Sequence, residues 1–351
     1  MRPVTRVYFA EDSPTVARVL QSLLEGAPDL ASAGIGADGL QARADLERLR
    51  PDILVTDLNM PGMDGFQLIQ WVMENQPIPI VVLSDALDAG DREMAMKCLG
   101  LGAMEARAKP RAGSPAELSE SREAFQGLLR ALKHVKPISR RSVSDARTPA
   151  PLILPRSSSP DLLAIGASTG GPPVILSILK ALGKGFPLPI LLSIHMEKGF
   201  MRDFGNSLSR TTGWAVKSGA EGEIPRPGVL YLPEEGQHLI LDSSAHLASV
   251  MPLAEDHLVP SVDRLFHSLA GNAGRQTCAL LLTGMGRDGA QGLKAIRNAG
   301  GLTFAQDEDS CVVYGMPKAA ADLGAAQAMM NPLEMVAALK RIVGPRERSA
   351  P

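Results

Sequence analysis

The sequence has few aromatic residues, few cysteines and no long hydrophobic run, and each absence argues against a class of protein. Aromatic residues make up 4% of the 351 residues, and the three cysteines are Cys98, Cys278 and Cys311. An odd number of cysteines without Cys-x-x-Cys spacing argues against a disulfide framework and favours reduced thiols in the core of a cytoplasmic protein. No apolar stretch approaches the roughly 18 residues that a membrane span needs. We therefore expect a cytoplasmic location and no direct membrane insertion.

The sequence also lacks an excess of charge of either sign. Its 36 Lys and Arg nearly balance its 38 Asp and Glu, so nothing predicts a basic surface for nucleic acid. The 45% of hydrophobic and 21% of charged residues are typical of a globular protein, and the length favours two domains. We expect domains at residues 1–133 and 161–351, joined by a flexible linker rich in Pro, Ser and Arg at 134–160. We also expect the protein to be a monomer.

Short apolar runs alternate with amphipathic segments from about residue 7 to residue 110. Ser13 and Pro14 are typical of the beginning of a helix, and a further helix is expected at about residues 116–133. The apolar runs that predict buried parallel strands are Val7–Ala10, Ile53–Thr56 and Ile80–Leu83. This order of elements indicates a doubly wound α/β domain.

Charged and polar residues follow these strands directly. Glu11 and Asp12 follow the first strand, Asp57 the third, Ser84 the fourth and Lys109 the fifth. They should therefore lie at the carboxyl ends of parallel strands, where open α/β sheets bind ligands. Clustered carboxylates can hold a hard cation such as Mg²⁺. A phosphoryl group on the aspartate would be neutralised by that cation and by the lysine, with the serine donating a hydrogen bond.

The segment Asp57–Gly65, together with the residues that flank it at these intervals, resembles the receiver domain of two-component response regulators. The resemblance covers the whole first domain and implies a flavodoxin-like fold. It implies a phosphoacceptor at Asp57, a Mg²⁺ site and a phosphorylation switch, with Mg²⁺ held by Glu11, Asp12, Asp57 and the carbonyl of Asn59 and the switch carried by Ser84 and Lys109.

Two positions depart from the receiver pattern. Receivers of this kind usually have Asp where this chain has Glu11, which keeps the carboxylate but adds a methylene. They also usually carry, near Ala106, an aromatic residue that turns inward on phosphorylation, and here none is present.

The second domain opens with a serine in a glycine-rich turn. Gly166–Gly171 follows the apolar run Leu162–Ile165 and precedes a helical segment, so Ser168 should stand above the end of a sheet. Such turns serve geometry or phosphate binding as well as catalysis. Further strands are predicted at Ile190–Ile194, Val229–Leu232 and Thr277–Leu282, which gives a second doubly wound α/β domain with a mainly parallel sheet.

A serine nucleophile needs a base and a group that orients the base. Of the six histidines, His195 comes directly after a predicted strand, and Asp288 lies in a glycine-rich loop after another. Each residue alone is more often structural, but three at three strand ends predict a Ser-His-Asp triad. The order along the chain differs from the Ser, Asp or Glu, His order of α/β-hydrolases. The turn does not match the Gly-x-Gly-x-x-Gly pattern of dinucleotide-binding proteins, because Ser168 occupies the place of the second glycine.

Residues 161 to about 345 resemble the catalytic domain of the chemotaxis protein-glutamate methylesterases, the CheB family. With the receiver in front, the architecture is similar from end to end. The resemblance places the triad on Ser168, His195 and Asp288, with Thr169 and Met285 near the oxyanion, where main-chain N–H groups could stabilise the tetrahedral intermediate. The matching stretches are Ile165–Pro172, Ser193–Met196, Pro260–Asp263, Leu281–Gly289, Ala305–Glu308 and Val313–Pro317.

The resemblance implies phosphorylation-regulated hydrolysis of glutamate γ-methyl esters in sensory adaptation. The substrate would be the cytoplasmic helices of a methyl-accepting chemotaxis-type receptor, and glutamine deamidation is implied as well. The phosphodonor would be a histidine kinase of the CheA type, and the esterase itself would need no cofactor. An alternative is a signalling adaptor with weak or phosphorylation-independent catalysis. A small-molecule esterase is disfavoured by the order of the triad and by the fused receiver.

Overall fold

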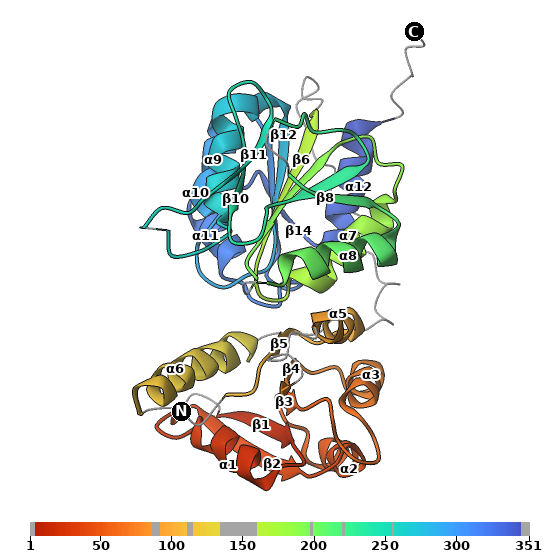
Figure 1. Cartoon of the computed structure of the whole chain (residues 1–351), viewed down its shortest axis with the longest axis vertical. Coiled ribbons are helices and arrows are strands. Elements are labelled where there is room, and N and C mark those ends of the chain that lie inside the picture. The colour runs from red at the N-terminus through yellow and green to blue at the C-terminus, as the bar shows by residue number, and fades with distance from the viewer. Residues whose placement is uncertain are drawn as a thin grey trace. The chain divides into compact units, whose positions relative to one another are not determined.

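The computed structural model describes residues 4–85, 92–110, 115–133, 160–196, 199–219, 222–254 and 256–344. The chain divides into two compact units, residues 1–144 and 145–351 (Figure 1). All but the last residue of the expected linker at 134–160 lies outside the described residues. Among the helices formed by described residues, none combines the length and the apolarity needed to cross a bilayer.

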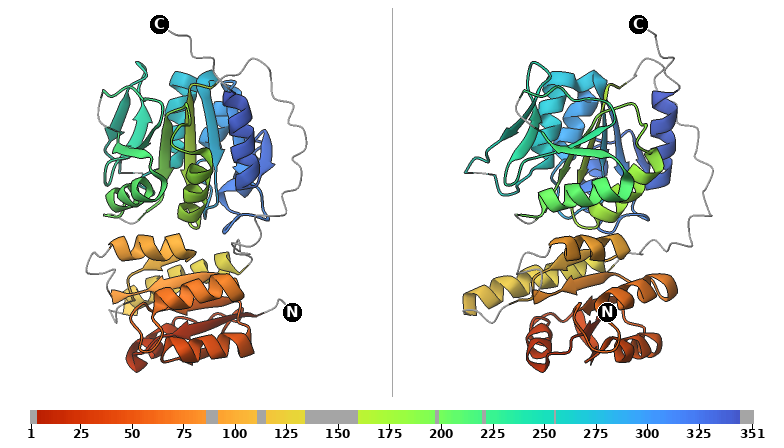
Figure 2. Two further views of the ribbon diagram at one scale, coloured as in Figure 1. Left: turned by 90° about the vertical axis from the view of Figure 1, so that its right-hand side faces the viewer. Right: turned by 45° about the vertical axis from the view of Figure 1, so that its right-hand side comes forward.

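The first unit is a five-stranded parallel sheet in the order β2-β1-β3-β4-β5. This order confirms the flavodoxin-like fold. Helices α1 and α6 cover one face of the sheet and α2, α3 and α5 the other (Figures 1 and 2). The elements are β1 (Thr5–Ala10), α1 (Pro14–Ser22), β2 (Leu30–Gly36), α2 (Gly39–Leu49), β3 (Ile53–Thr56), α3 (Gly65–Asn75), β4 (Ile80–Leu83), α5 (Arg92–Leu101), β5 (Glu105–Arg107) and α6 (Pro115–Leu132).

Local sequence explains these elements. All residues of β3 and β4 are buried, as expected for parallel strands covered on both faces. Helix α1 begins as predicted, with Pro14 in its first turn and the Ser13 hydroxyl accepting a hydrogen bond from the Val16 N–H. The predicted strands at 53–56 and 80–83 are confirmed to the residue.

The second unit is a seven-stranded sheet in the order β14-β13-β12-β6-β7-β9-β8, with every pairing parallel, and a separate antiparallel hairpin, β10-β11. Its strands are β6 (Leu162–Ala167), β7 (Ile190–Ile194), β8 (Ala215–Ser218), β9 (Val229–Leu232), β10 (His238–Leu241), β11 (Leu247–Val250), β12 (Thr277–Leu281), β13 (Leu302–Gln306) and β14 (Ala328–Met330). Its helices are α7 (Gly171–Leu182), α8 (Met201–Thr212), α9 (Val262–Ala273), the short 3-10 helix η2 (Gly274–Gln276), α10 (Ala290–Asn298), α11 (Met316–Asp322) and α12 (Pro332–Val343).

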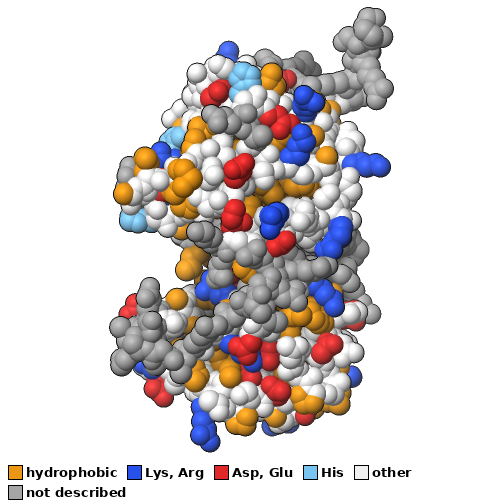
Figure 3. All heavy atoms as spheres, in the orientation of Figure 1, with side chains coloured by type: hydrophobic (Ala, Val, Ile, Leu, Met, Phe, Trp, Pro, Cys, Tyr) orange, Lys and Arg blue, Asp and Glu red, His pale blue; other side chains and the backbone are white. Residues whose placement is uncertain are grey.

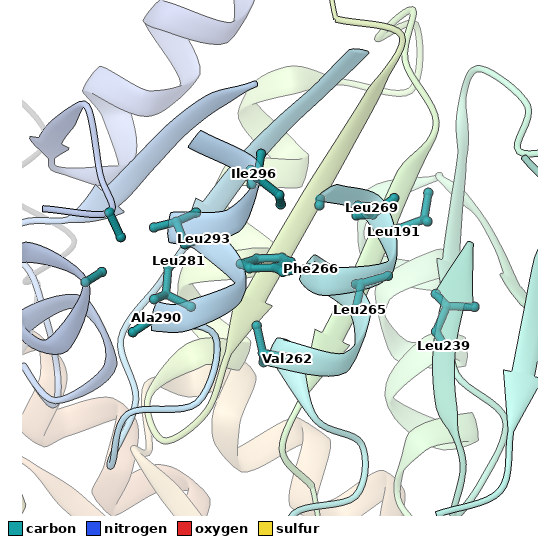
Figure 4. Close-up of a cluster of buried hydrophobic side chains, with 14 of the residues drawn as sticks. Leu191, Leu239, Val262, Leu265, Phe266, Leu269, Leu281, Ala290, Leu293 and Ile296 are labelled. Atoms are coloured by element: carbon teal, nitrogen blue, oxygen red, sulfur yellow. The ribbon is translucent and has the colours of Figure 1, made fainter. Parts of the chain in front are cut away.

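Helices α9, α10 and α11 lie on one face of this sheet and α7, α8 and α12 on the other (Figure 1). A buried apolar cluster joins α9 and α10 to the sheet and to β10 (Figure 4). Burying one such side chain contributes about 1.5–3 kcal/mol, so the cluster holds α9 and α10 against the sheet. Its labelled members are Leu191, Leu239, Val262, Leu265, Phe266, Leu269, Leu281, Ala290, Leu293 and Ile296.

The described surface carries both signs of charge. On the face drawn in Figure 3, basic and acidic side chains are interspersed, and apolar side chains occur between them. All three cysteines are free and buried, as the sequence predicts.

Candidate active site

Ser168, His195 and Asp288 follow three neighbouring strands of the second sheet. Ser168 comes directly after β6, His195 directly after β7, and Asp288 in the loop between β12 and α10. Strand β6 pairs with β7 on one side and with β12 on the other. Because the strands are parallel, their carboxyl ends meet at one edge, at the point where the strand order reverses.

The side chains are within hydrogen-bond distance of one another. His195 Nδ1 lies 3.1 Å from Ser168 Oγ, and His195 Nε2 lies 2.7 Å from Asp288 Oδ2. An ionised carboxylate only accepts hydrogen bonds, so the imidazole proton belongs on Nε2. The lone pair on Nδ1 then faces the serine hydroxyl, which is the arrangement of a general base next to a nucleophile.

Asp288 is held at the N-terminus of α9. Both of its oxygens accept hydrogen bonds, and its side chain is 8% exposed. Burial alone would raise the pKa of Asp288, but the hydrogen bond and charge of His195 and the N–H groups of α9 lower it to about 2. The carboxylate is therefore ionised at neutral pH, as the positive end of a helix dipole favours. Its donors are His195 Nε2, Ser261 Oγ and the main-chain N–H groups of Val262, Asp263 and Gly289.

The turn that carries Ser168 depends on a close neighbour in the next loop. The Ser168 N–H donates to the Thr283 carbonyl at 3.0 Å, which ties the turn to the end of β12. A Cβ atom at Gly284 would lie 2.7 Å from the Ser168 Cβ and would overlap the Met316 sulfur. Only glycine allows the two loops to approach this closely.

Thr169 directly follows Ser168 in the chain, and Met285 directly follows Gly284, which lies close to Ser168. Thr169 lies in the turn that leads into α7, and Met285 follows Gly284 in the loop after β12, with 48% of its surface exposed. Within the described part of the chain, no acceptor is recorded for the main-chain N–H of either residue.

In the first unit, the acidic residues meet at the ends of β1 and β3. Glu11, Asp12 and Asp57 can each place one carboxylate oxygen so that the three atoms lie within 4.8 Å of one another. Lys109 Nζ lies 2.8 Å from Asp57 Oδ2 and 3.0 Å from Glu11 Oε1. Ser84 is fully buried after β4, and its Oγ has no partner among the described residues.

This cluster fits a divalent cation. Burial raises the pKa of Glu11, against the effect of the neighbouring ammonium. Burial alone would lower the pKa of Lys109, but the two carboxylates raise it, so it stays a cation. Glu11 Oε2 is buried without a hydrogen bond, although it lies 2.9 Å from Lys109 Nζ. Such an oxygen is a suitable ligand for Mg²⁺. Asn59 is exposed on the following loop, and Ala106 is half-buried on β5.

Two further residues support the triad, and neither is among the site residues that the sequence predicts. Ser261 caps α9 by accepting the Arg264 N–H and also donates to Asp288. His238, 1% exposed, accepts the Ser261 N–H. The sequence around residue 261 has the form of a helix start, but its contact with Asp288 spans 27 residues and no local pattern shows it.

Comparisons with known proteins match both units. Residues 163–339 match the family model described as CheB methylesterase, and residues 7–120 match the response regulator receiver domain. The protein-glutamate methylesterase/protein-glutamine glutaminase 2 of Methanospirillum hungatei is 38% identical over 343 residues, which cover 96% of this chain and 98% of that protein. The corresponding protein 3 of Myxococcus xanthus is 37% identical over 324 residues, covering 92% and 89%.

A solved structure agrees with these matches. The CheB methylesterase catalytic domain of Thermotoga maritima superposes with a TM-score of 0.50 at 32% identity, covering 53% of this chain and 100% of that domain. The chain therefore belongs to the CheB family of protein-glutamate methylesterases/protein-glutamine glutaminases, with a receiver domain in front of the methylesterase domain.

Proposed function

We propose that this chain hydrolyses glutamate γ-methyl esters on the cytoplasmic helices of methyl-accepting chemotaxis-type receptors, using Ser168, His195 and Asp288. The observation that carries the proposal is the chain of two hydrogen bonds, 3.1 Å and 2.7 Å long, that joins the three side chains. Relatives that match nearly the whole chain are named for this activity. The reaction would take place in the cytoplasm and serve sensory adaptation.

Ser168 Oγ attacks the ester carbonyl carbon while its proton moves to His195 Nδ1. The imidazolium that forms is stabilised by Asp288, which stays ionised because its pKa is about 2. The imidazolium then protonates the departing methoxide, so that methanol leaves and the glutamyl group remains bound to the serine. Water activated by the same nitrogen hydrolyses this acyl-enzyme.

The main-chain N–H groups of Thr169 and Met285 would receive the oxyanion of each tetrahedral intermediate. Each such donor contributes about 3 kcal/mol to the transition state in related chemistry. A glutamine side chain presents the same carbonyl with ammonia as leaving group, so the same residues support deamidation. No step requires a metal or a cofactor in the second unit.

In the first unit, Asp57 would accept a phosphoryl group from a histidine kinase of the CheA type. Glu11, Asp12, Asp57 and the Asn59 carbonyl would hold Mg²⁺, which neutralises charge on the phosphoryl oxygens. Lys109 and Ser84 would contact the phosphoryl group, because one is an ammonium 2.8 Å from Asp57 and the other is a buried hydroxyl without a described partner. Phosphorylation would then regulate hydrolysis through a two-state change in the receiver.

The chemistry is tested by methanol release from a methylated receptor. We expect Ser168→Ala to abolish release and Ser244→Ala, in the exposed turn between β10 and β11, to leave it unchanged. Equal rates for wild type and Ser168→Ala would refute the triad. If the wild-type protein folds correctly but releases no methanol, the alternative function, a signalling adaptor, would be favoured instead.

Regulation is tested separately with a small-molecule phosphodonor and Mg²⁺. The donor should change the rate of methanol release by wild type but not by Asp57→Asn, which keeps the shape of the side chain. Without the donor, the two proteins should release methanol at the same rate. A wild type that does not respond to the donor would contradict phosphorylation control while leaving the esterase assignment intact.

A further inference from the structure

A second histidine–aspartate pair lies behind the triad, outside the atoms that react. His238 begins β10 and is 1% exposed. Its Nε2 lies 3.2 Å from Asp256 Oδ2, and its Nδ1 accepts the Ser261 N–H at 2.9 Å. The Ser261 hydroxyl in turn donates to Asp288 Oδ1 at 2.9 Å. One residue thus separates the second pair from the triad.

The partners fix the tautomer of His238. The Ser261 N–H is a donor, so Nδ1 must carry the lone pair. The proton is then on Nε2, where the Asp256 carboxylate accepts it. Arg264 donates hydrogen bonds to both oxygens of that carboxylate at 3.0 Å, and the Leu253 N–H donates to it as well. Each of these groups therefore faces a partner of the opposite kind.

The pair is also tied to the helix whose first turn holds Asp288. Arg264 lies on α9, so the contacts run from α9 through Asp256 and His238 back to the cap of α9. Next to His238, Leu239 belongs to the same buried cluster as Val262 and Leu265 of α9 (Figure 4). The N-terminus of α9 therefore contacts β10 through a hydrogen bond of His238 and through the apolar side chain of Leu239.

We infer that His238, oriented by Asp256, is a positioning residue for hydrolysis: by accepting the Ser261 N–H it sets the first turn of α9, which aims the Asp288 carboxylate at His195. The inference rests on the proposed function of the triad. A displacement of about 1 Å in a catalytic group can cost about 100-fold in rate, so a shift of this turn should lower kcat and leave KM nearly unchanged.

Two substitutions separate positioning from simple burial. In His238→Asn the amide oxygen can take the place of Nδ1 and accept the Ser261 N–H. In His238→Gln the amide reaches the place of Nε2, keeps a group next to Asp256 and loses the acceptor for Ser261. His246→Gln, in the half-exposed turn of the same hairpin, is the matched control.

The experiment measures kcat and KM for methanol release and the rate at which a sulfonyl fluoride labels Ser168. Labelling reports the reactivity of the serine whatever the natural ester is. We expect His238→Gln to lower kcat and labelling by about 10-fold to 100-fold, with KM within about twofold. The decrease in kcat and labelling rate should be about tenfold smaller for His238→Asn than for the glutamine variant. His246→Gln should match wild type in both.

If both variants at residue 238 melt at lower temperature but match wild type in kcat and labelling while folded, the inference is overturned and His238 is structural only. If wild type neither releases methanol nor is labelled, the proposed function fails and the inference with it. Should His238→Gln not fold, Asp256→Ala removes the acceptor for Nε2–H instead. It is expected to lower kcat in the same direction, and an unchanged kcat there would also overturn the inference.

Discussion

Replacing Asp288 by asparagine keeps the shape of the side chain but leaves only one of its two terminal atoms able to accept a hydrogen bond. Of its two oxygens, Oδ1 faces two main-chain donors, Asp263 and Gly289, whereas Oδ2 faces His195 and one main-chain donor, Val262. The amide nitrogen should therefore take the place of Oδ2. It would donate to His195 Nε2, so the imidazole proton would move to Nδ1. That nitrogen could no longer accept the proton of the serine.

Asp288→Asn should affect both stability and rate. The fall of the Asp288 pKa from 3.8 to about 2 corresponds to about 2 kcal/mol of preference for the carboxylate. Leaving the Val262 N–H without an acceptor adds to this cost, so we expect Asp288→Asn to lose about 3 kcal/mol of unfolding free energy. The wrong tautomer should lower kcat by about 10⁴-fold, the size of the loss in other triads.

The assay is methanol release at saturating methylated receptor, paired with urea unfolding of the second unit. Unfolding is followed by the fluorescence of the buried Trp214 in a Trp71→Phe background, so that the first unit does not contribute. Asp322→Asn, an exposed acid on α11, is the control and should change neither quantity. A folded Asp288→Asn protein with kcat within tenfold of wild type would refute this account of the hydrogen bonds.

Three further outcomes are expected. Gly284→Ala should lower both the melting temperature and kcat, since the new methyl group would meet Ser168 and Met316; unchanged values would show that the loops can separate freely. Because the folded pKa of Asp288 is depressed, its contribution to stability is complete above about pH 4 and is lost as the pH falls toward 2. The advantage of wild type over Asp288→Asn in urea unfolding should shrink in that window, and a constant difference would contradict the assignment. Lys109→Met should destabilise the first unit by about 3–5 kcal/mol by leaving two buried carboxylates unpaired, and Mg²⁺ should raise its melting temperature more than that of wild type; an equal rise in both would argue against a metal at this cluster.

The fold was predictable where apolar runs are continuous. Ile53–Thr56, Ile80–Leu83, Ile190–Ile194 and Val229–Leu232 form strands with the predicted ends, because parallel strands buried on both faces need side chains of that kind at every position. A second strand before Ile53 is implied by the strand order, but its residues, Leu30–Gly36, do not stand out in the sequence. It is rich in alanine, serine and glycine, so its place depends on pairing with β1 rather than on its own hydrophobic pattern.

The candidate site was predictable to the extent that strand ends place residues. Ser168 and His195 directly follow β6 and β7, and Asp288 lies in the loop after β12, so their positions along the chain bring them to one edge of the sheet. The support of Asp288 was not predictable, since it comes from the first turn of α9. The role of His238 was likewise not predictable. Its side chain is 1% exposed, but a histidine that follows a turn has the same sequence pattern whether it is exposed or buried. Burial and partners from 18 and 23 residues away distinguish the two cases.

The most direct test of the account is the fate of solvent oxygen during hydrolysis of a methylated receptor in water enriched in heavy oxygen. Attack by Ser168 on the carbonyl carbon, followed by hydrolysis of the acyl-enzyme, predicts that the label enters the receptor glutamate carboxylate and that Ser168→Ala gives no labelled product. Label recovered in methanol, or labelling of the glutamate at the same rate by Ser168→Ala, would contradict it.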